Sequence, residues 1–281
     1  MARTPNILVF DSGLGGLTVF AEVAREVPDA HFTYVADDAG FPYGRLSEMT
    51  LVARVTEVMT RLVARHAPHL VVVACNTAST LVLPRLRAHF PRVAFVGTVP
   101  AIKPAALASQ SRLFSVLATP GTVARDYTRD LIRTFAGHCE VTLVGADGLA
   151  TLAENYMLGG PADDTAIAAE IAPCFVERDG RRTDTVVLAC THYPLLIERL
   201  RALAPWRVAW IDPAAAIARR AAHVLREELG FRLPLKQDAA YGDLGEAFFT
   251  NGHVPNETVQ KALRARGLTA LDCAPLPLLL S

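Results

Sequence analysis

Two stretches of the chain, VVVACNT at residues 71–77 and VVLACTH at residues 186–192, are similar to one another. Each is a short apolar run, typical of a buried strand in a parallel sheet, that ends in a cysteine and two polar residues. A weaker similarity lies ahead of each copy, between LVFDSG at residues 8–13 and VLATPG at residues 116–121. The repeat predicts two similar halves, with Cys75 and Cys190 at the same structural place.

Short apolar runs alternate with helix-like segments along the chain. The longest helical segment, residues 47–65, has an apolar stripe that includes Leu51 and Val55, and Arg54 is expected on its polar face. Such alternation predicts an α/β fold in which mostly parallel sheets are flanked by helices. The expected strands are residues 7–10, 32–35, 70–74, 93–96, 113–118, 141–144, 186–189 and 208–211, and the other expected helices are residues 164–176, 194–203 and 214–229.

The repeat also predicts how the chain is divided into domains. Residues 1–98 and 208–281 are expected to form a first α/β domain, with Asp11 and Cys75, and residues 99–207 a second, with Cys190 and His192. Ligands of open parallel sheets bind beyond the carboxyl ends of the strands. The active site is therefore expected in a cleft between two pseudo-symmetric domains.

The composition argues against several classes of protein. The chain has 281 residues, with 28 Lys and Arg against 28 Asp and Glu. This balance gives no reason to expect a nucleic-acid partner. The apolar run at residues 7–10 is too short for a signal sequence, and no stretch has the length of a membrane span. A cytoplasmic protein without a membrane partner is the expectation.

The cysteines give no sign of a structural framework. None of the five forms a CxxC motif or a Cys/His cluster with zinc-ligand spacing, so no metal site is expected. An odd number of cysteines in a reducing compartment also argues against a set of disulfides. Most free cysteines are small buried residues, and that interpretation competes with any catalytic role for Cys75 and Cys190.

A cysteine between a strand and a helix lies where backbone N–H groups favour an anion. Such a thiol can have its pKa lowered from about 8.5 toward neutrality, and can then act as a nucleophile or a base. A nucleophilic mechanism needs one thiol and a base of another kind. Two thiols at equivalent places suit a reaction that removes a proton from one face of a carbon and returns one to the other face.

The neighbouring residues fit proton transfer. His192 follows Cys190 by two residues and Asp11 ends another strand, although a capping or surface role would explain either residue alone. Hydroxyl and amide side chains gather at the same predicted edge and could hold carboxylates. The turn at residues 42–44 could place a tyrosine and open backbone against a ligand, although an ordinary surface turn would also explain it. The turn GLGG at residues 13–16 is not a dinucleotide fingerprint, so no such cofactor is expected. The polar side chains are Ser12, Asn76, Thr77, Thr119, Thr122 and Thr191.

Five motifs in order resemble those of the glutamate racemase family, within the aspartate/glutamate racemase superfamily. They are DSGLGGLTV (residues 11–19), PYG (42–44), ACNTAS (74–79), TVPAIKPA (98–105) and ACTHYPLL (189–196). The resemblance extends from about residue 7 to residue 212, and residues 247–252 resemble the C-terminal segment of the family.

The resemblance implies a cofactor-independent isomerase with two α/β domains and the substrate between them. Such an enzyme interconverts L- and D-glutamate with two bases and supplies D-glutamate for bacterial peptidoglycan. By motif match, Cys75 takes the α-proton from D-glutamate and Cys190 takes it from L-glutamate, with Asp11 and His192 assisting. Glu154 matches an acidic residue that supports the histidine. The matched substrate-binding residues are Asp11, Ser12, Tyr43, Gly44, Asn76, Thr77, Thr122, Thr191 and His192.

The sequence departs from the family pattern near the PYG motif. Gly40 stands where members often have Arg, and Arg45-Leu46 precede Ser47 where a charged residue is expected next to the serine. Pro213 follows Asp212 where many members have Ser. These departures affect one substrate-lining loop and leave both cysteines in place. Family members commonly form dimers, so a homodimer is one expectation for this chain.

Three other functions remain open from the residues. A related racemase acting on aspartate or a hydantoin would keep both cysteines but change the carboxylate-binding hydroxyls. A cysteine-nucleophile hydrolase or amidotransferase would use Cys190 and His192 and would leave Cys75 without a role. A noncatalytic small-molecule binding module would not need reactive residues at both strand ends.

Overall fold

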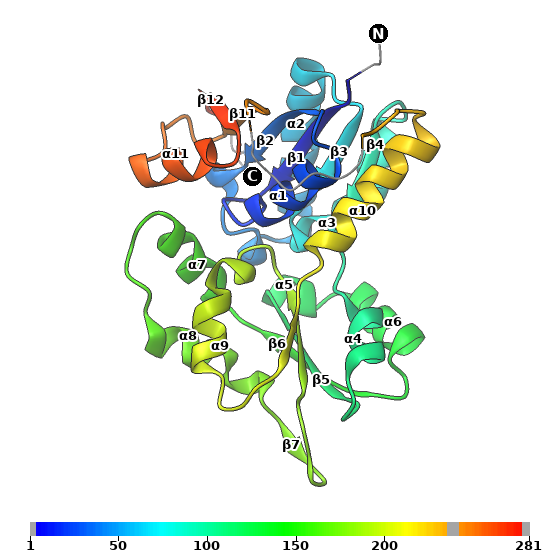
Figure 1. Cartoon of the computed structure of the whole chain (residues 1–281), viewed down its shortest axis with the longest axis vertical. Coiled ribbons are helices and arrows are strands. Elements are labelled where there is room, and N and C mark those ends of the chain that lie inside the picture. The colour runs from blue at the N-terminus through cyan, green and yellow to red at the C-terminus, as the bar shows by residue number, and fades with distance from the viewer. Residues whose placement is uncertain (1–3, 235–241, 277–281) are drawn as a thin grey trace. The chain divides into compact units, whose positions relative to one another are not determined.

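The computed structural model describes residues 4–234 and 242–276 of the chain. The described residues fall into two compact units. Unit 1 contains the residues up to Thr98 and those from Ala214 onward, and unit 2 contains Val99–Pro213. Each unit is built around its own parallel sheet with helices on both faces (Figure 1).

The sheet of unit 1 has six strands in the order β12-β11-β2-β1-β3-β4, all parallel. Its central strand β1 is buried almost throughout, as a near-continuous apolar sequence favours. The strands are β1 (Asn6–Asp11), β2 (His31–Ala36), β3 (Leu70–Val73), β4 (Ala94–Gly97), β11 (Gly245–Phe249) and β12 (Leu268–Cys273).

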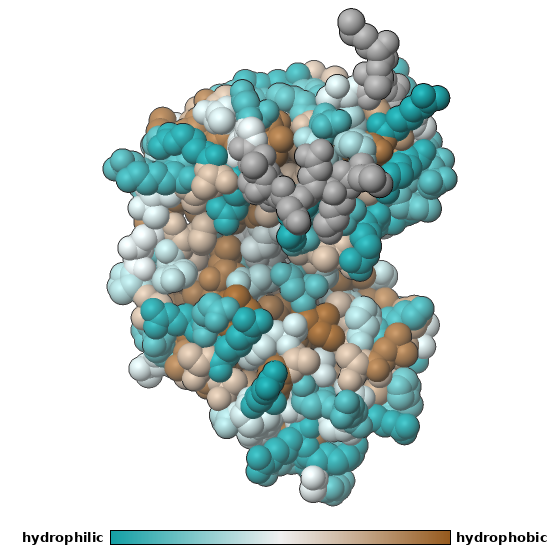
Figure 2. Space-filling model, viewed as in Figure 1, coloured by the Kyte–Doolittle hydropathy of each residue, from teal (hydrophilic) through white to brown (hydrophobic). Residues whose placement is uncertain are grey.

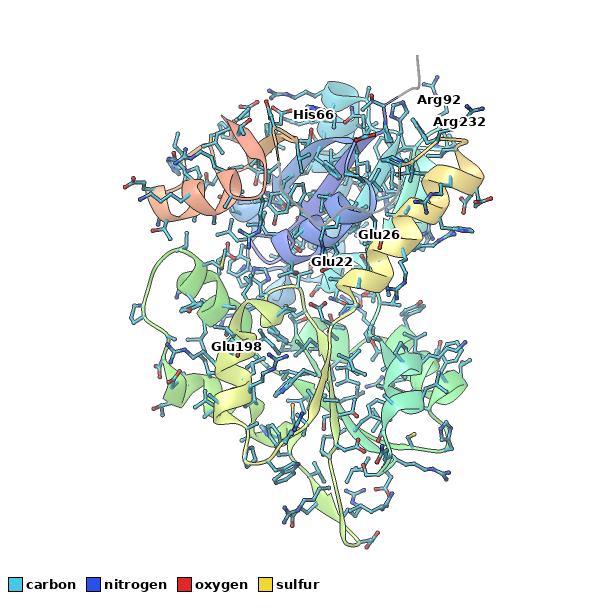
Figure 3. All side chains as sticks on the ribbon, in the orientation of Figure 1. Glu22, Glu26, His66, Arg92, Glu198 and Arg232 are labelled. Carbon is cyan, nitrogen blue, oxygen red and sulfur yellow. The ribbon has the colours of Figure 1, made fainter. Side chains whose placement is uncertain are left out.

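Helices cover both faces of this sheet. On one face Phe20 of α1 packs edge-on against Phe32 and Tyr34 of β2, and α1 in turn packs against α10. Glu22 and Glu26 extend from α1 beside α10 (Figure 3). On the other face α2 and α3 share a core with β1 and β3. The elements are α1 (Leu17–Glu26), α2 (Glu48–His66), α3 (Asn76–His89), α10 (Ala214–His223), α11 (Glu257–Arg264), the 3-10 turns η1 (Asp38–Gly40) and η2 (Tyr43–Arg45), and the π-helical turn η5 (Val224–Glu228).

Unit 2 has a four-stranded parallel sheet in the order β10-β9-β5-β6. A small antiparallel hairpin, β7–β8, forms a hydrophilic tip at the bottom of the view in Figure 2. The strands are β5 (Leu113–Ala118), β6 (Glu140–Gly145), β7 (Glu177–Arg178), β8 (Arg181–Arg182), β9 (Thr185–Ala189) and β10 (Ala209–Ile211). The helices are α4 (Ile102–Ala108), α5 (Pro120–Val123), α6 (Asp126–Phe135), α7 (Leu149–Met157), α8 (Asp164–Ile171), α9 (Ile197–Leu203), and the 3-10 turns η3 (Ala172–Cys174) and η4 (Tyr193–Leu196).

The predicted internal repeat is confirmed by the strand order. The order β6-β5-β9-β10 of unit 2 repeats the order β2-β1-β3-β4 of unit 1. The registers agree as well, because Phe10 pairs with Val73 as Leu117 pairs with Leu188. Cys75 lies two residues beyond Val73, and Cys190 lies two residues beyond Leu188, so the two cysteines occupy equivalent positions in the two units.

The second crossing between the units lies later than the sequence analysis places it. We predicted a return to the first half at residue 208, but β10 pairs with β9 and completes the second sheet. The return therefore comes at Ala214, the first residue of α10. The first segment of unit 1 ends at Thr98 and unit 2 ends at Pro213, one and two residues beyond the fourth strand of the respective repeat.

All eight expected strands are present, but β11, β12 and the β7–β8 hairpin were not predicted. Their sequences mix charged and small residues with apolar ones, and β12 is an edge strand with exposed positions. The prediction for Arg54 is wrong, because its side chain is only 3% exposed. A buried carboxylate, described below, explains why this charged residue turns inward.

Gly245, at the start of β11, is a position that only glycine fits. Its φ is +144°, and a Cβ atom there would lie 1.9 Å from the backbone oxygen of Phe32. We expect Gly245→Ala to lower the free energy of unfolding by about 3 kcal/mol, because strain and overpacking add. Gly230→Ala is the matched control, since its φ is +69° but no atom lies within 4 Å, and it should cost about 1 kcal/mol. Urea denaturation measures both, and equal losses would contradict the role of β11 packing.

Candidate functional site

The strand order fixes where polar side chains can gather in each unit. The connection from β1 runs to β2 on one side, whereas β3 lies on the other side. Ligands of open sheets bind at such a reversal, because the loops leave the strand ends uncovered there. In unit 1 the reversal lies between the ends of β1 and β3, and in unit 2 between the ends of β5 and β9.

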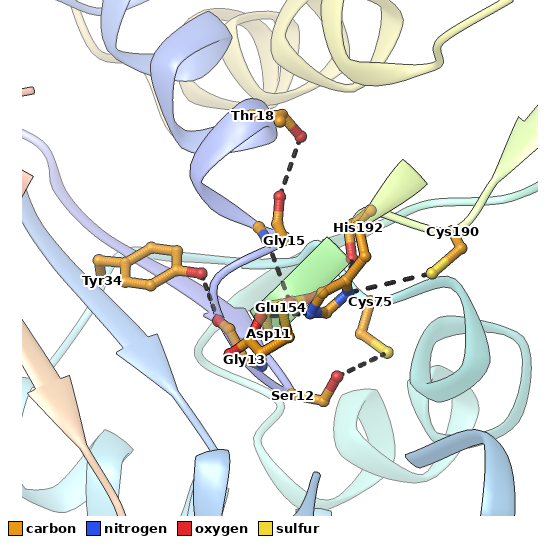
Figure 4. A network of polar contacts seen from close by, with 12 residues as sticks. Asp11, Ser12, Gly13, Gly15, Thr18, Tyr34, Cys75, Glu154, Cys190 and His192 are labelled. Atoms are coloured by element: carbon orange, nitrogen blue, oxygen red, sulfur yellow. Dashed lines mark hydrogen bonds and ion pairs between the residues drawn. The ribbon is translucent and has the colours of Figure 1, made fainter. Parts of the chain in front are cut away.

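Asp11, the last residue of β1, is fully buried and is held by the glycine-rich turn after it. Its Oδ2 atom accepts hydrogen bonds from the backbone N–H groups of Gly13 and Gly16, at 3.3 Å and 3.1 Å (Figure 4). A Cβ atom on Gly16 would lie 2.6 Å from the Asp11 Cβ atom, so glycine is needed for this close approach. The hydroxyl of Tyr34 donates to the Gly13 carbonyl at 2.6 Å and fixes the turn. Asp11 is thus oriented by the backbone.

Cys75 occupies the N-cap position of α3, where the strand gives way to the helix. Its side chain is 5% exposed, and its Sγ atom lies 3.9 Å from the hydroxyl of Ser12 (Figure 4). The unpaired N–H groups of a helix start favour negative charge on a thiol placed there. Unit 1 therefore brings together Ser12 after β1 and Cys75 after β3, as the sequence analysis expected.

Asn76 and Thr77 form the first turn of α3 and are buried. Within the described residues, neither the Oδ1 nor the Nδ2 atom of Asn76 has a hydrogen-bond partner. A buried amide without partners costs free energy, and native proteins seldom leave one unexplained. An amide offers both a donor and an acceptor, so this position suits a polar ligand such as a carboxylate or an ammonium group.

Tyr43 and Gly44 lie in η2, and the Tyr43 side chain is buried in the same core cluster as Cys75. The Tyr43 hydroxyl donates a hydrogen bond to Asp37, the residue after β2. Burial, followed by the charge of Asp37, raises the pKa of Tyr43 well above its usual range. Tyr43 is therefore a neutral hydrogen-bond donor at physiological pH.

In unit 2 a buried chain of contacts joins Cys190, His192 and Glu154. The Nδ1 atom of His192 lies 4.0 Å from the Sγ atom of Cys190, and its Nε2 atom lies 2.8 Å from Oε2 of Glu154 (Figure 4). Burial alone would lower the pKa of His192, but its contacts with Cys190 and Glu154 raise it well above its usual range. The arrangement favours an imidazolium ion next to the thiol of Cys190.

The remaining predicted residues of unit 2 follow the strands β5 and β9. The hydroxyl of Thr191 lies 3.5 Å from His192 Nδ1. Thr122 is fully buried in α5, the short helix after β5, which Thr119 caps by accepting a hydrogen bond from the Thr122 N–H group. Unit 2 therefore places Thr122 beyond β5, and Cys190, Thr191 and His192 beyond the neighbouring β9.

The sequence analysis did not assign three further buried polar residues of unit 1, which lie near Tyr43, to the site. Asp37, Arg54 and Thr250 form a hydrogen-bonded group below η2. Asp37 follows an expected strand, and that position indicated a residue at the ligand-binding edge of the sheet. Arg54 and Thr250 gave no such signal, because one lies within a helix and the other follows an unpredicted strand.

Two kinds of feature are absent from the described residues. No helix in residues 4–234 and 242–276 is long and apolar enough to cross a membrane. In the same residues no group of three or more His, Cys, Asp or Glu side chains is arranged to hold a metal ion.

Comparison with known protein families identifies the class of protein to which this fold, with its two equivalent cysteines, belongs. Residues 9–221 match the model of the Asp/Glu/Hydantoin racemase family, and the chain belongs to that family. It is 54% identical to a glutamate racemase of Brucella canis over 262 residues, which cover 93% of this chain and 92% of that protein.

Solved structures of similar proteins agree with this family. The crystal structure of Escherichia coli glutamate racemase in complex with L-glutamate and the activator UDP-MurNAc-ala has a TM-score of 0.85 and 39% identity, and the match covers 98% of this chain and all of that one. The RacE1 isoform of glutamate racemase from Bacillus anthracis has a TM-score of 0.78 and 25% identity, with 99% of this chain covered and all of that one.

The contact between His192 and Glu154 generates a prediction. We expect Glu154→Gln to lower the pKa of His192, because the carboxylate charge is lost while burial remains. NMR titration of the His192 ring in the full-length protein measures this change. Glu198→Gln, a surface change in the same unit with the glutamate side chain 80% exposed, is the control. An unchanged His192 titration in Glu154→Gln would show that a group other than Glu154 keeps the pKa of His192 raised.

Proposed function

We propose that the protein is a glutamate racemase that interconverts L- and D-glutamate with Cys75 and Cys190 as its two bases. The observation that carries the proposal is the equivalence of the two cysteines, which follow the same strand of a repeated sheet. A racemase must exchange a proton at either face of one carbon, and two thiols of like strength suit that task.

The choice of glutamate rests on similarity and on the polar residues beside the cysteines. The relative with 54% identity is a glutamate racemase, and the E. coli relative was crystallised with L-glutamate. In this chain, Asn76 offers an amide without partners among the described residues. Hydroxyls of Ser12, Thr122 and Thr191, with Tyr43 and the backbone of Gly44, are proposed to complete the contacts to the amino acid.

The proposed chemistry balances without an oxidant or a cofactor. From L- to D-glutamate, the Cys190 thiolate removes the α-proton and becomes a thiol. The electron pair of the broken C–H bond stays on the α-carbon, and the Cys75 thiol delivers its proton to the opposite face and becomes a thiolate. In the reverse direction the two cysteines exchange roles.

Each cysteine has a different proposed assistant. The His192 imidazolium, held by Glu154, stabilises the Cys190 thiolate through their opposite charges. Asp11 is proposed to assist Cys75 from the end of β1, next to Ser12, whose hydroxyl lies 3.9 Å from the Cys75 sulfur. The two thiols are thus tuned by unlike groups.

A hydrolase or amidotransferase built on Cys190 and His192 is the second candidate. The distance of 4.0 Å between the Cys190 sulfur and His192 favours it in part. It gives no task to Cys75, however, although that residue stands at a helix start in the equivalent place.

The proposed product, D-glutamate, would serve bacterial peptidoglycan synthesis. The mechanism needs both cysteines as free thiols, and therefore a reducing compartment such as the cytoplasm. A homodimer stays a prediction.

Incubation with L-glutamate in D₂O tests the activity and its stereochemistry. We expect D-glutamate with deuterium at the α-carbon, because the incoming proton comes from a solvent-exchanged thiol. Early in the reaction the remaining L-glutamate should keep its α-proton, since one base removes and the other delivers. Proton NMR with chiral chromatography measures both. Unchanged optical rotation at high enzyme concentration would overturn the proposal.

Cysteine replacements test the assignment of the two bases. We expect Cys75→Ala and Cys190→Ala each to lower kcat by about 10²- to 10⁴-fold, because each removes a proton-transfer group. Cys174→Ala is the matched control, since Cys174 is a buried cysteine of unit 2 whose pKa burial raises to about 12. It should keep near-normal turnover. Near-normal turnover in both directions by either of the first two variants would exclude the two-base mechanism.

A further inference from the structure

A buried ion pair lies below the turn that carries Tyr43. The Nε and Nη2 atoms of Arg54 donate to the two carboxylate oxygens of Asp37, at 2.7 Å and 2.6 Å. The Asp37 side chain is fully buried and that of Arg54 is 3% exposed. This two-pronged geometry is the strongest and most directional that Arg and a carboxylate can form.

The same carboxylate gathers two hydroxyl groups from distant parts of the chain. Tyr43 donates to Oδ2 of Asp37, the oxygen that the Arg54 Nε atom also contacts. Thr250, directly after β11, donates to Oδ1 at 2.6 Å. Asp37 therefore links the end of β2, helix α2, the turn η2 and the C-terminal part of unit 1.

Stability alone does not account for this pair. Taking both charges out of water is costly, and apolar residues of similar volume often stabilise a protein as well or better. Within the described residues, the Arg54 Nη1 atom is buried without a hydrogen-bond partner, which adds to the cost. A buried ion pair can, however, hold neighbouring groups in one conformation among several. Here the group held is the Tyr43 side chain, whose hydroxyl donates to Asp37.

Gly40 makes the arrangement possible. A Cβ atom on Gly40 would lie 2.3 Å from Arg54 Nε and 2.9 Å from the Tyr43 ring atom Cε1. The bare backbone at this position leaves the space through which the Arg54 side chain reaches Asp37. The departure from the family pattern at Gly40 thus coincides with a buried arginine supplied by α2.

We propose that Arg54, acting through Asp37, is a positioning residue that fixes Tyr43 and the adjoining Gly44 backbone for substrate binding. The inference rests on the proposed function, in which Tyr43 and Gly44 contact glutamate. Tyr43 packs in the same core cluster as Cys75, and η2 packs against α3, which Cys75 caps. A rotated Tyr43 would therefore disturb the substrate contacts next to one catalytic thiol.

A double variant tests the inference without leaving a lone buried charge. Asp37→Asn with Arg54→Met removes both charges and keeps side chains of similar size. We expect KM for glutamate to rise about tenfold while kcat changes by less than about threefold, because substrate contacts loosen but both thiols remain. The matched control replaces the surface pair on the same helix, Glu57→Gln with Arg61→Met, whose side chains are 37% and 46% exposed, and should leave both constants unchanged.

A cycle with Tyr43→Phe distinguishes positioning from general destabilisation. If Arg54 and Asp37 act through the Tyr43 hydroxyl, the double variant should add little to the KM increase already caused by Tyr43→Phe. Thr250→Val, which removes one hydrogen bond and no charge, should give a smaller rise in KM. The inference would be overturned if the double variant and Tyr43→Phe each multiplied KM by the same factor whether or not the other change was present. It would also be overturned if the KM of the double variant stayed within about twofold of wild type.

Wild-type activity separates this inference from the proposed function. A wild-type protein that does not racemise glutamate overturns both. A wild-type protein that racemises glutamate, together with a double variant that melts at a lower temperature but keeps its KM, overturns the positioning role alone.

Discussion

The hydrogen bonding of one central strand on both its edges is the constraint on which the rest of this structure depends. In unit 1, β1 pairs with β2 and with β3, and in unit 2, β5 pairs with β6 and with β9. The chain must therefore leave the central strand toward one side and return on the other. The strand ends stay uncovered at that reversal, and the side chains that follow them are free to serve chemistry.

The registers show how two equal frameworks hold unequal sites. Cys75 and Cys190 occupy equivalent positions, but Asp11 corresponds to Ala118 and Thr77 corresponds to His192. The central strand of unit 1 thus ends in an aspartate, whereas the cysteine of unit 2 is followed by a histidine that Glu154 contacts. Two bases that act on opposite faces of one carbon each need a suitable proton affinity, and unlike neighbouring groups can supply it.

The strands and the paired cysteines could be predicted from sequence because apolar runs and strand-end residues are local signals. The buried state of Arg54 could not, because an arginine on a helix is usually solvated and its partner Asp37 is distant in sequence. The strand β11 was missed since Gly245-Glu246 interrupts its apolar pattern, and with it Thr250 was missed. The crossing at Ala214 depended on β10, whose pairing is a tertiary property.

Unit 2 is inserted into unit 1, between β4 and α10. During synthesis the ribosome therefore completes unit 2 as one continuous segment before it makes α10, β11 and β12. Unit 2 has all its strands as soon as it emerges and can fold then, as domains generally fold as units. In unit 1, β2 remains an open sheet edge until β11 has been synthesised. The hydrogen bond from Thr250 to Asp37 can consequently form only after β11 has been synthesised, so the contacts of the Tyr43 turn are completed later than unit 2.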